Sequence, residues 1–306
     1  MMEKAIEHIS RDELFDILSI QSTALKATHD FMEKRKIIQL LPVMLSTITD
    51  PLSHPVFDSS IDYCNQKLEL TKSMILHKQL ALLQPRLNGL YIVSPNIRLE
   101  LPEESKEERH AFEFSQVDIE LKHASMKDFM NFTEELFISI FKKILKERKT
   151  ELRRLDRTLS APKKKFKIFD KDDLEKEFGE DFEKQISLQQ KELFWITSHK
   201  REFYDKEIIE KPGKYANYDL VLPEGFGEVL SGGEREFEFE RIISRMKKKG
   251  MKLENYEAYL SAAKHGFESS AGGGFGVERL TRFLAGKKRL KDVTIFARSP
   301  GEKVIV

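Results

Sequence analysis

Residues 272–280 read GGGFGVERL, a run of three glycines followed by a glutamate–arginine pair and a helical-looking segment. Glycine lets a backbone approach a ligand closely, and the start of a helix favours an anion, so this pattern is typical of a phosphate-binding turn. The chain contains no GxxxxGK[ST] motif and no GxGxxG motif after a clear strand, which excludes the two common nucleotide-binding patterns. A nucleotide site built on residues 272–280 would therefore belong to another architecture.

A second group of candidate residues lies in IRLE, residues 97–100, where a strand would place Arg98 and Glu100 on the same face. Such a pair is usually a surface ion pair across a sheet, which contributes little to stability. It would also suit a nucleotide, because a guanidinium can hold a phosphate bidentately and a carboxylate can accept a hydrogen bond from the adenine amino group. The two residues by themselves favour the ion pair.

Further polar residues follow at strand spacing. Phe114, Gln116, Asp118 and Glu120 alternate on one face of EFSQVDIE, although Phe114 could equally be a core residue. Asp219 and Glu228 flank a predicted strand turn, and paired carboxylates near a phosphate site are natural Mg²⁺ ligands. These residues need a common explanation, which no single motif among them supplies.

Composition limits the class of protein. The 306 residues include 52 Lys and Arg against 51 Asp and Glu, and the net charge of +1 gives no electrostatic footprint for a dedicated nucleic-acid binder. The single cysteine, Cys64, excludes a disulfide framework and a multi-cysteine metal site, and we expect it to be buried or half-buried in a strand. The charged N-terminus has no apolar signal core and no run reaches membrane-spanning length, so we expect a cytoplasmic protein without a membrane segment.

The elements that must position these residues are short strands and amphipathic helices. We expect two helices near residues 1–40, the second stopped by Pro42, and a long helix that begins with the capping box of Ser125 and Asp128. Strands are predicted at 61–71, 89–101, 113–124, 192–206, 215–222, 226–236 and 293–297, and further helices at 72–84, 170–185, 239–250 and 254–266. Hairpin-linked strands flanked by helices predict an α+β fold, with an antiparallel sheet and helices on its faces, in a single domain over residues 1–306.

In this order, the motifs resemble the three signature motifs of class II aminoacyl-tRNA synthetases. KRKIIQLLPVML (34–45) resembles the first motif, which forms the dimer interface in that family. IRLE, the charged loop after it, RHAFEF and QVDIE resemble the second motif, and GGGFGVERL resembles the third. The resemblance covers roughly residues 15–300 and implies the class II fold and a homodimer.

The resemblance also implies an ATP site. In the family's pattern, Arg98 holds the α-phosphate, Glu100 accepts from the adenine amino group, and Phe114 lies under the adenine ring. Arg109 and His110 would lie near the terminal phosphates, and Arg279 would lie against the γ-phosphate. Gly276 and Glu228 complete the implied ATP-binding set, Asp219 and Glu228 would bind Mg²⁺, and the catalytic residues would be Arg98, Glu228 and Arg279.

Within this family the chain is most similar to the aspartyl and asparaginyl enzymes, through SMILHKQ (73–79) and YDLVLPEGFGEVLSGGERE (218–236). A carboxylate side chain calls for two cations, and the similarity places Lys78 and Arg235 in that role. Residues implied for the rest of the aspartate site are Asp50, Ser73, Gln116, Asp118 and Ser231. Ile75 stands where the family has a glutamine, which puts the contacts to the α-amino group in question.

The expected function depends on which molecule accepts the activated aspartyl group. The aspartyl and asparaginyl enzymes carry an N-terminal anticodon-binding barrel of on the order of a hundred residues, for which this sequence has no room before its first motif. With the near-neutral charge and an acidic loop at 102–108, we expect tRNA to be an unlikely partner. The chain then resembles the asparagine synthetases related to asparaginyl-tRNA synthetase.

We therefore expect an AMP-forming aspartate–ammonia ligase that makes asparagine from aspartate, ATP and free ammonia through an aspartyl-adenylate. Because ammonia must attack the β-carboxyl carbon, aspartate would bind reversed, with its α-carboxylate on Lys78 and Arg235. The alternative is a synthetase paralogue that aminoacylates a tRNA or a protein side chain. A third possibility, an inert regulatory subunit, is disfavoured because the ATP-binding residues are present.

Overall fold

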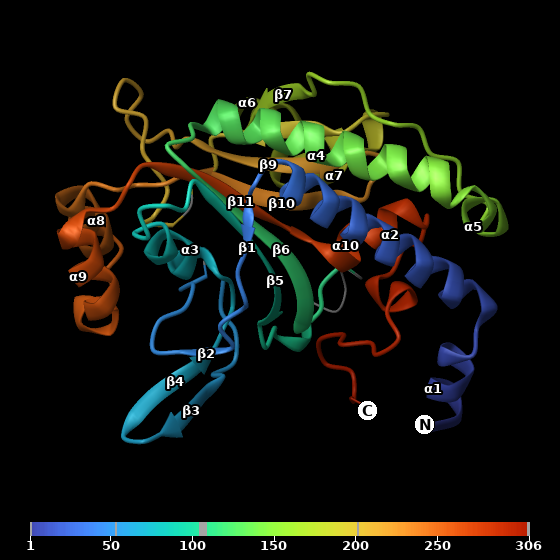
Figure 1. The fold of residues 1–306 in the computed structure, drawn as a ribbon, viewed down its shortest axis with the longest axis horizontal. Coiled ribbons are helices and arrows are strands. Elements are labelled where there is room, and N and C mark those ends of the chain that lie inside the picture. Colours follow the sequence, from blue (N-terminus) through green and yellow to red (C-terminus); the bar gives the residue numbers. More distant parts are fainter. Residues whose placement is uncertain (1, 53, 104–108, 201, 305–306) are drawn as a thin grey trace.

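The computed structural model of the protein describes residues 2–52, 54–103, 109–200 and 202–304 (Figure 1). The helices are α1 (Met2–Ile9), α2 (Asp12–Lys34), α3 (Ile75–Ala81), α4 (Met126–Glu147), α5 (Lys149–Arg154), α6 (Lys171–Phe178), α7 (Phe182–Gln189), α8 (Phe239–Lys248), α9 (Glu257–Gly266) and α10 (Val277–Leu284). The strands are β1 (Ile38–Gln39), β2 (Leu45–Ser46), β3 (Ser60–Tyr63), β4 (Gln66–Leu70), β5 (Gly89–Ile97), β6 (Glu113–Lys122), β7 (Lys167–Asp170), β8 (Phe194–Thr197), β9 (Asn217–Leu222), β10 (Gly227–Glu234) and β11 (Ser270–Gly276).

A large sheet forms the centre of the molecule, in the strand order β1-β5-β6-β11-β10-β9-β8-β7. All neighbouring pairs are antiparallel except β1–β5 and β7–β8, which are parallel. A second sheet, in the order β2-β4-β3, projects from the rest of the chain (Figure 1). The predicted α+β fold with an antiparallel-dominated sheet flanked by helices is confirmed.

One face of the large sheet is covered by α2 and α4, which run side by side across it in Figure 1, and by α10. The predicted capping box of Ser125 and Asp128 starts α4. Its apolar stripe packs on alternate residues of the strands, for example Phe129 on Tyr218 and Phe137 on Phe275. These rings belong to the largest buried cluster, which fixes the register of the middle strands.

The opposite face is covered mainly at its ends. Val221 faces α6 and α7 and packs with Leu174 and Ile186, whereas its neighbours Leu220 and Leu222 belong to the core on the other side. At the other end, α3, α8 and α9 share a separate core with the loops at Ile48 and Tyr204. Between these two groups of helices the middle strands β6, β11 and β10 line a pocket.

Several predicted elements differ in the structure. The glycines of residues 272–274 lie inside β11 in the middle of the sheet, and not in a turn. The predicted strand 61–71 is a hairpin whose turn residues Cys64 and Asn65 have φ values of 49° and 61°. Cys64 is exposed, so the expected burial is wrong. Without a glycine, this turn gives no breaker signal in the sequence.

Other helices and strands also begin or end at residues different from those predicted. Helix α2 ends at Lys34, well before Pro42, because the chain turns there to form β1 beside β5. The predicted helix 170–185 is interrupted by a 3-10 turn that begins at Gly179, whose φ is 69°. Lys167–Asp170 form β7, a strand that the sequence did not predict, while the predicted strand 293–297 is not among the strands of the described chain. In the residues that the structure describes, no helix combines the length and apolar character needed to cross a bilayer.

Candidate functional site

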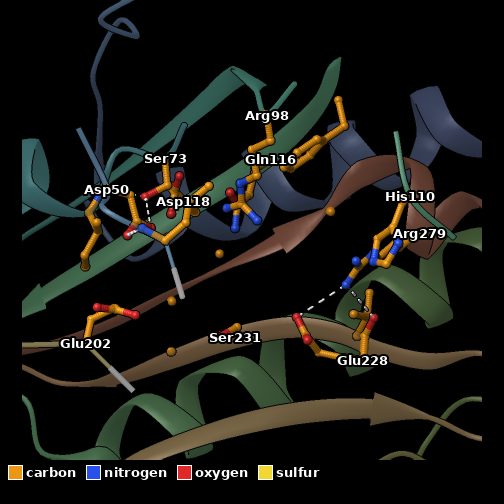
Figure 2. Close-up of a pocket in the computed structure, with 18 of the residues that line it drawn as sticks. Asp50, Ser73, Arg98, His110, Gln116, Asp118, Glu202, Glu228, Ser231 and Arg279 are labelled. Atoms are coloured by element: carbon orange, nitrogen blue, oxygen red, sulfur yellow. Dashed lines mark hydrogen bonds and ion pairs between the residues drawn. The ribbon is translucent and has the colours of Figure 1, made fainter. Parts of the chain in front are cut away.

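A pocket of about 340 Å³ opens on the uncovered part of the sheet face (Figure 2). Its lining includes every site residue predicted from the sequence except Asp219. These residues come from strands β6, β10 and β11, from helices α3 and α10 and from four connecting loops, which are far apart in the chain. The fold therefore brings together the residues that the motifs predicted as one site.

The glycines of β11 form part of the pocket floor. Gly272 is paired with Glu120 and Gly274 with Asp118 on the neighbouring strand β6. A Cβ atom on Gly272 would lie 1.9 Å from Oε2 of Glu120, and one on Gly274 would lie 2.2 Å from Nε2 of Gln116. The sequence led us to expect glycines that let the backbone crowd the ligand. In the structure they make room for polar side chains of β6, which lie across the glycines.

The end of the pocket at α3 contains the two predicted cations, which are buried and already paired. Nζ of Lys78 lies 2.9 Å from Oδ1 of Asp118 and 3.5 Å from Oε2 of Glu120. Arg235 donates to both carboxylate oxygens of Glu120, at 3.0 and 3.1 Å. Burial opposes the charge of Arg235, but Glu120 and Asp205 raise its pKa above the usual value. Glu120, which the sequence placed on this strand face without a role of its own, thus bridges the two cations.

Beside these cations lies a group of carboxylates. Asp50 accepts hydrogen bonds from Oγ of Ser73 at 2.9 Å and from the hydroxyl of Tyr204 at 3.2 Å, both neutral donors. Oδ2 of Asp118 is buried, and no donor among the described residues reaches it. A cationic group of a ligand, such as an α-ammonium, would satisfy this oxygen. Sequence reasoning missed Tyr204, which no motif singled out.

A further carboxylate, Glu202, lines the same end of the pocket and lies across from Asp50 in Figure 2. It is 8% exposed, and its Oε2 pairs with Nζ of Lys249 at 2.9 Å. Sequence reasoning missed Glu202 because it stands in an irregular segment after β8, where no periodicity marks a pocket-facing side chain.

The middle of the pocket holds the residues expected at the adenine and the α-phosphate. The guanidinium carbon of Arg98 lies 5.2 Å from the ring centre of Phe114, and its Nε donates to the carbonyl of Lys72 at 3.1 Å. Arg98 and Glu100, the two candidate residues of IRLE, lie just beyond β5, which ends at Ile97. Glu100 is buried and its carboxylate contacts Nε2 of His54 at 3.0 and 3.2 Å. His54 was not predicted, and it ties the loop after Asp50 to the expected adenine-binding residue.

The opposite end of the pocket carries half-buried arginines. Nη1 of Arg279 lies 3.4 Å from Oε1 of Glu228, and Figure 2 shows His110 at the same end. Nη1 of Arg109 lies 2.7 Å from Oε1 of Glu183 on α7, another residue that the sequence did not indicate. This end could hold the terminal phosphates of a nucleotide, because guanidinium groups bind phosphate oxygens through charge-assisted hydrogen bonds.

The two predicted Mg²⁺ ligands, Asp219 and Glu228, have different surroundings in the structure. Asp219 on β9 is paired with Nε2 of His199 at 3.1 Å and is not among the described residues that line the pocket, whereas Glu228 is. Within the described ranges, no group of three or more His, Cys, Asp or Glu is placed to hold a metal ion. Mg²⁺ needs only one or two carboxylates when phosphates and water supply the other oxygens. Glu228 lines the pocket and fits this role, whereas the assignment of Asp219 to Mg²⁺ stays a prediction.

Comparison with known proteins gives a consistent result. Residues 1–300 match the family described as tRNA synthetases class II (D, K and N). The asparagine–tRNA ligase of Thermococcus gammatolerans is 25% identical, over 96% of this chain and 71% of its own length. The aspartate–tRNA(Asp/Asn) ligase of Methanopyrus kandleri is 27% identical, over 97% of this chain and 70% of its own length.

The fold matches solved structures over nearly the whole chain. The asparaginyl-tRNA synthetase from Pyrococcus horikoshii, in complex with asparaginyl-adenylate, has a TM-score of 0.89 and 23% identity, and the match covers 99% of this chain and 72% of that one. The aspartyl-tRNA synthetase from Entamoeba histolytica has a TM-score of 0.78 and 22% identity, over 95% of this chain and 59% of that one. The class II synthetase fold implied by the motifs is confirmed.

These relatives contradict the expectation that tRNA is an unlikely partner, because they are named as tRNA ligases and align with almost the whole chain. The expectation rested on net charge, which is a sum over the chain and does not report how charge is distributed over one surface. It also rested on the acidic loop 102–108, and residues 104–108 lie outside the part of the chain that the structure describes.

Proposed function

Since the chain belongs to the class II tRNA synthetases of the D, K and N group, we propose that it activates aspartate with ATP and transfers the aspartyl group to a tRNA. The observation that carries this proposal is that one pocket has the buried cations Lys78 and Arg235 at one end and the half-buried cations Arg109 and Arg279 at the other. We assign the first end to a carboxylate and the second to phosphates. An amino acid and the triphosphate of ATP would meet between them, near Arg98.

In the proposed first step, an oxygen of the aspartate α-carboxylate attacks the α-phosphorus of ATP, and the bond to the bridging oxygen of pyrophosphate breaks. Arg98 would stabilise the charge on the α-phosphate, and Arg109 and Arg279 would stabilise the charge on the leaving pyrophosphate. Bound Mg²⁺, held by Glu228 and phosphate oxygens, would neutralise further negative charge. The residues of the chain would act by orienting aspartate and ATP in one reactive geometry and by stabilising the developing negative charge.

Aspartate is the proposed amino acid because its side chain matches two buried cations. Lys78 and Arg235 share Glu120, so a substrate carboxylate would meet a preformed pair of donors whose positions are fixed. An asparagine amide would present its own N–H groups to these donors, and it would leave part of their hydrogen-bonding capacity unused.

The direct test is ATP–pyrophosphate exchange with each amino acid in turn, followed by charging of total tRNA. We expect exchange that depends on aspartate and a labelled aspartyl-tRNA. The Arg98→Ala variant should lose exchange by on the order of a thousandfold while keeping its fold, since Arg98 is half-buried. Exchange with asparagine alone would overturn the choice of amino acid, and exchange that survives Arg98→Ala would overturn the assignment of the α-phosphate site.

A second candidate, the aspartate–ammonia ligase, is favoured by Glu202. Glu202 lines the amino-acid end together with Asp50, Asp118 and Asp205, whereas one α-ammonium needs fewer carboxylate partners. A carboxylate-rich wall would attract ammonium, and aspartate bound in reverse would present its β-carboxyl group for activation. Ammonia would then attack the acyl carbon of the aspartyl-adenylate, with release of AMP and formation of asparagine.

The two candidates are separated by the product. Incubation with ATP, Mg²⁺, aspartate and ammonium, without tRNA, should yield asparagine, AMP and pyrophosphate if the second candidate holds, and no asparagine if only the first does. Glutamine should replace ammonium poorly, because a thiol nucleophile is needed to release its amide and Cys64 lies in the distant β3–β4 turn. Glu202→Gln should raise the ammonium concentration needed for half-maximal rate and leave ATP–pyrophosphate exchange unchanged.

We also propose a homodimer through the segment around residues 30–45. Ile38, Leu41 and Leu45 are 50%, 87% and 41% exposed, and a second copy of the chain would cover these apolar side chains. Light scattering should report a dimer at micromolar concentration, and Leu41→Glu should shift it toward the monomer. A wild-type monomer under these conditions would contradict the proposal.

A further inference from the structure

Helix α7 is fastened to the turn between β9 and β10 by two residues on the same helix face, Glu183 and Ser187. Oγ of the buried Ser187 donates to the carbonyl of Leu222 at 2.7 Å and accepts from the backbone N–H of Gly225 at 3.0 Å. Oε1 of Glu183, one helical turn earlier, accepts from the backbone N–H of Glu228 at 3.1 Å. Both contacts fix the helix against the strand that carries Glu228.

Glu183 makes one contact that Ser187 does not. The same Oε1 atom accepts from Nη1 of Arg109 at 2.7 Å, and Arg109 lies in the loop that joins β5 to β6. The space for this contact exists because residue 227 is glycine. A Cβ atom on Gly227 would lie 2.8 Å from Oε1 of Glu183 and 3.0 Å from Nη1 of Arg109, and its φ of 76° also favours glycine.

The contact connects both arginines at this end of the pocket. Glu183 holds Arg109 through its side chain, and it holds the backbone of Glu228, whose carbonyl and carboxylate oxygens face Nη1 of Arg279 at 3.3 and 3.4 Å. A single carboxylate from a helix outside the pocket lining therefore positions one arginine directly and supports the partner of the other. The motifs that predicted the arginines give no indication of Glu183.

We propose that Glu183 is a positioning residue for the terminal phosphates of ATP, a role that rests on the proposed ATP-dependent activation. It holds the guanidinium of Arg109 at the phosphate end before the nucleotide arrives, so that binding does not have to order a long side chain at the end of a loop. The two outer phosphates then receive a donor that is already in place. AMP lacks these phosphates, so its binding does not depend on Glu183.

The opposite role for Glu183 would be that of a competitor. A carboxylate that occupies Arg109 in place of a phosphate would weaken ATP binding, and its removal would then strengthen it. Only one Nη atom of Arg109 contacts Glu183 at hydrogen-bond distance, and a guanidinium carries five N–H donors. Arg109 can therefore keep Glu183 and still donate to phosphate, which favours the positioning role.

The experiment measures equilibrium binding of ATP and of AMP by calorimetry, without turnover. We expect Glu183→Ala to weaken ATP binding by roughly fivefold, a modest effect because the pair is partly exposed, and to leave AMP binding unchanged. Glu183→Gln keeps an acceptor oxygen and should recover most of the affinity. Ser187→Ala is the matched control, because it loosens the same helix but does not touch Arg109, and it should not change the ratio of ATP to AMP affinity.

A double-mutant cycle tests whether Glu183 acts through Arg109 or only by stabilising the surrounding structure. In the Arg109→Ala background, Glu183→Ala should cause no further loss of ATP affinity, because the residue that it positions is gone. Equal weakening of ATP and AMP, or an undiminished loss in the Arg109→Ala background, would overturn the proposal, as would tighter ATP binding by Glu183→Ala. If the wild-type protein binds neither nucleotide, the proposed function itself fails, and that result is distinct from all of these.

Discussion

The two ends of the pocket use their cations differently. At the amino-acid end, Lys78 and Arg235 are 1% and 2% exposed, and each is held by buried carboxylates. At the phosphate end, the side chains of Arg109 and Arg279 are 30% and 24% exposed and pair with half-buried glutamates. A buried charge cannot lose its partner without a large penalty, whereas an exposed one is solvated by water. Changes at the first end should therefore affect stability and binding together, and changes at the second mainly binding.

The largest effect is expected from Lys78→Met. Asp118 and Glu120 would both lose a cation in a buried site, so the free energy of unfolding should fall by on the order of 3–5 kcal/mol, and aspartate binding should be lost. Chemical denaturation and ATP–pyrophosphate exchange measure the two losses. Lys143→Met is the matched control, because Lys143 also contacts two carboxylates, Asp30 and Glu147, but on the surface of α4, and it should unfold almost like the wild type. Equal stability of both variants would break the comparison.

An intermediate effect is expected from Arg279→Ala at the other end. ATP binding should weaken by about tenfold or more through loss of a charge-assisted contact to phosphate, while the free energy of unfolding changes by less than about 1 kcal/mol. Aspartate affinity measured in the absence of ATP should not change. A large loss of stability here would mean that both ends are built in the same way.

The smallest effect concerns Glu278, in the first turn of α10 at the phosphate end. Its Oε2 is buried without a donor among the described residues, and burial raises its pKa, while the backbone N–H of Ser115 lowers it in part. The folded protein thus holds this proton more tightly than the unfolded chain does. The contribution of Glu278 to the free energy of unfolding is therefore fully present below the ordinary pKa of 4.5. It is lost as the pH rises through the raised pKa of the folded protein. Unfolding curves over that pH range should show a fall for the wild type that Glu278→Gln lacks, and identical profiles would contradict the assignment.

The sequence predicted most of the pocket because its residues sit in motifs with fixed spacing. Strand alternation placed Gln116 and Asp118 on one face, and the family pattern added Arg98, Lys78, Arg235 and Arg279. The fold class followed from hairpin-linked strands in the same way. These are local patterns, which a sequence carries in full.

The remaining residues depend on tertiary contacts that no spacing reveals. Glu120 lies on the same predicted strand face, but its role as a bridge appears only when Lys78 approaches it from α3 and Arg235 from the position directly after β10. His54 reaches the pocket from a loop, and Glu183 contacts the pocket residue Arg109 from helix α7. The ion pair of Asp219 with His199 is likewise not visible in the sequence, because His199 lies at the start of the segment that joins β8 to β9 and Asp219 lies in β9. The predicted strand boundaries were wrong where a turn lacked glycine, as at Cys64.

The floor of β11 limits how this pocket can evolve or be redesigned. Gly272 and Gly274 have no side chains because Glu120, Gln116 and Asp118 occupy that space. An engineered specificity that adds a side chain to β11 must therefore shorten its neighbour on β6 in the same step, and the pairs 272 with 120 and 274 with 118 should vary together across homologues. A single substitution at either position would produce a clash or a cavity, so mutational paths to a new amino acid should pass through double changes at these pairs.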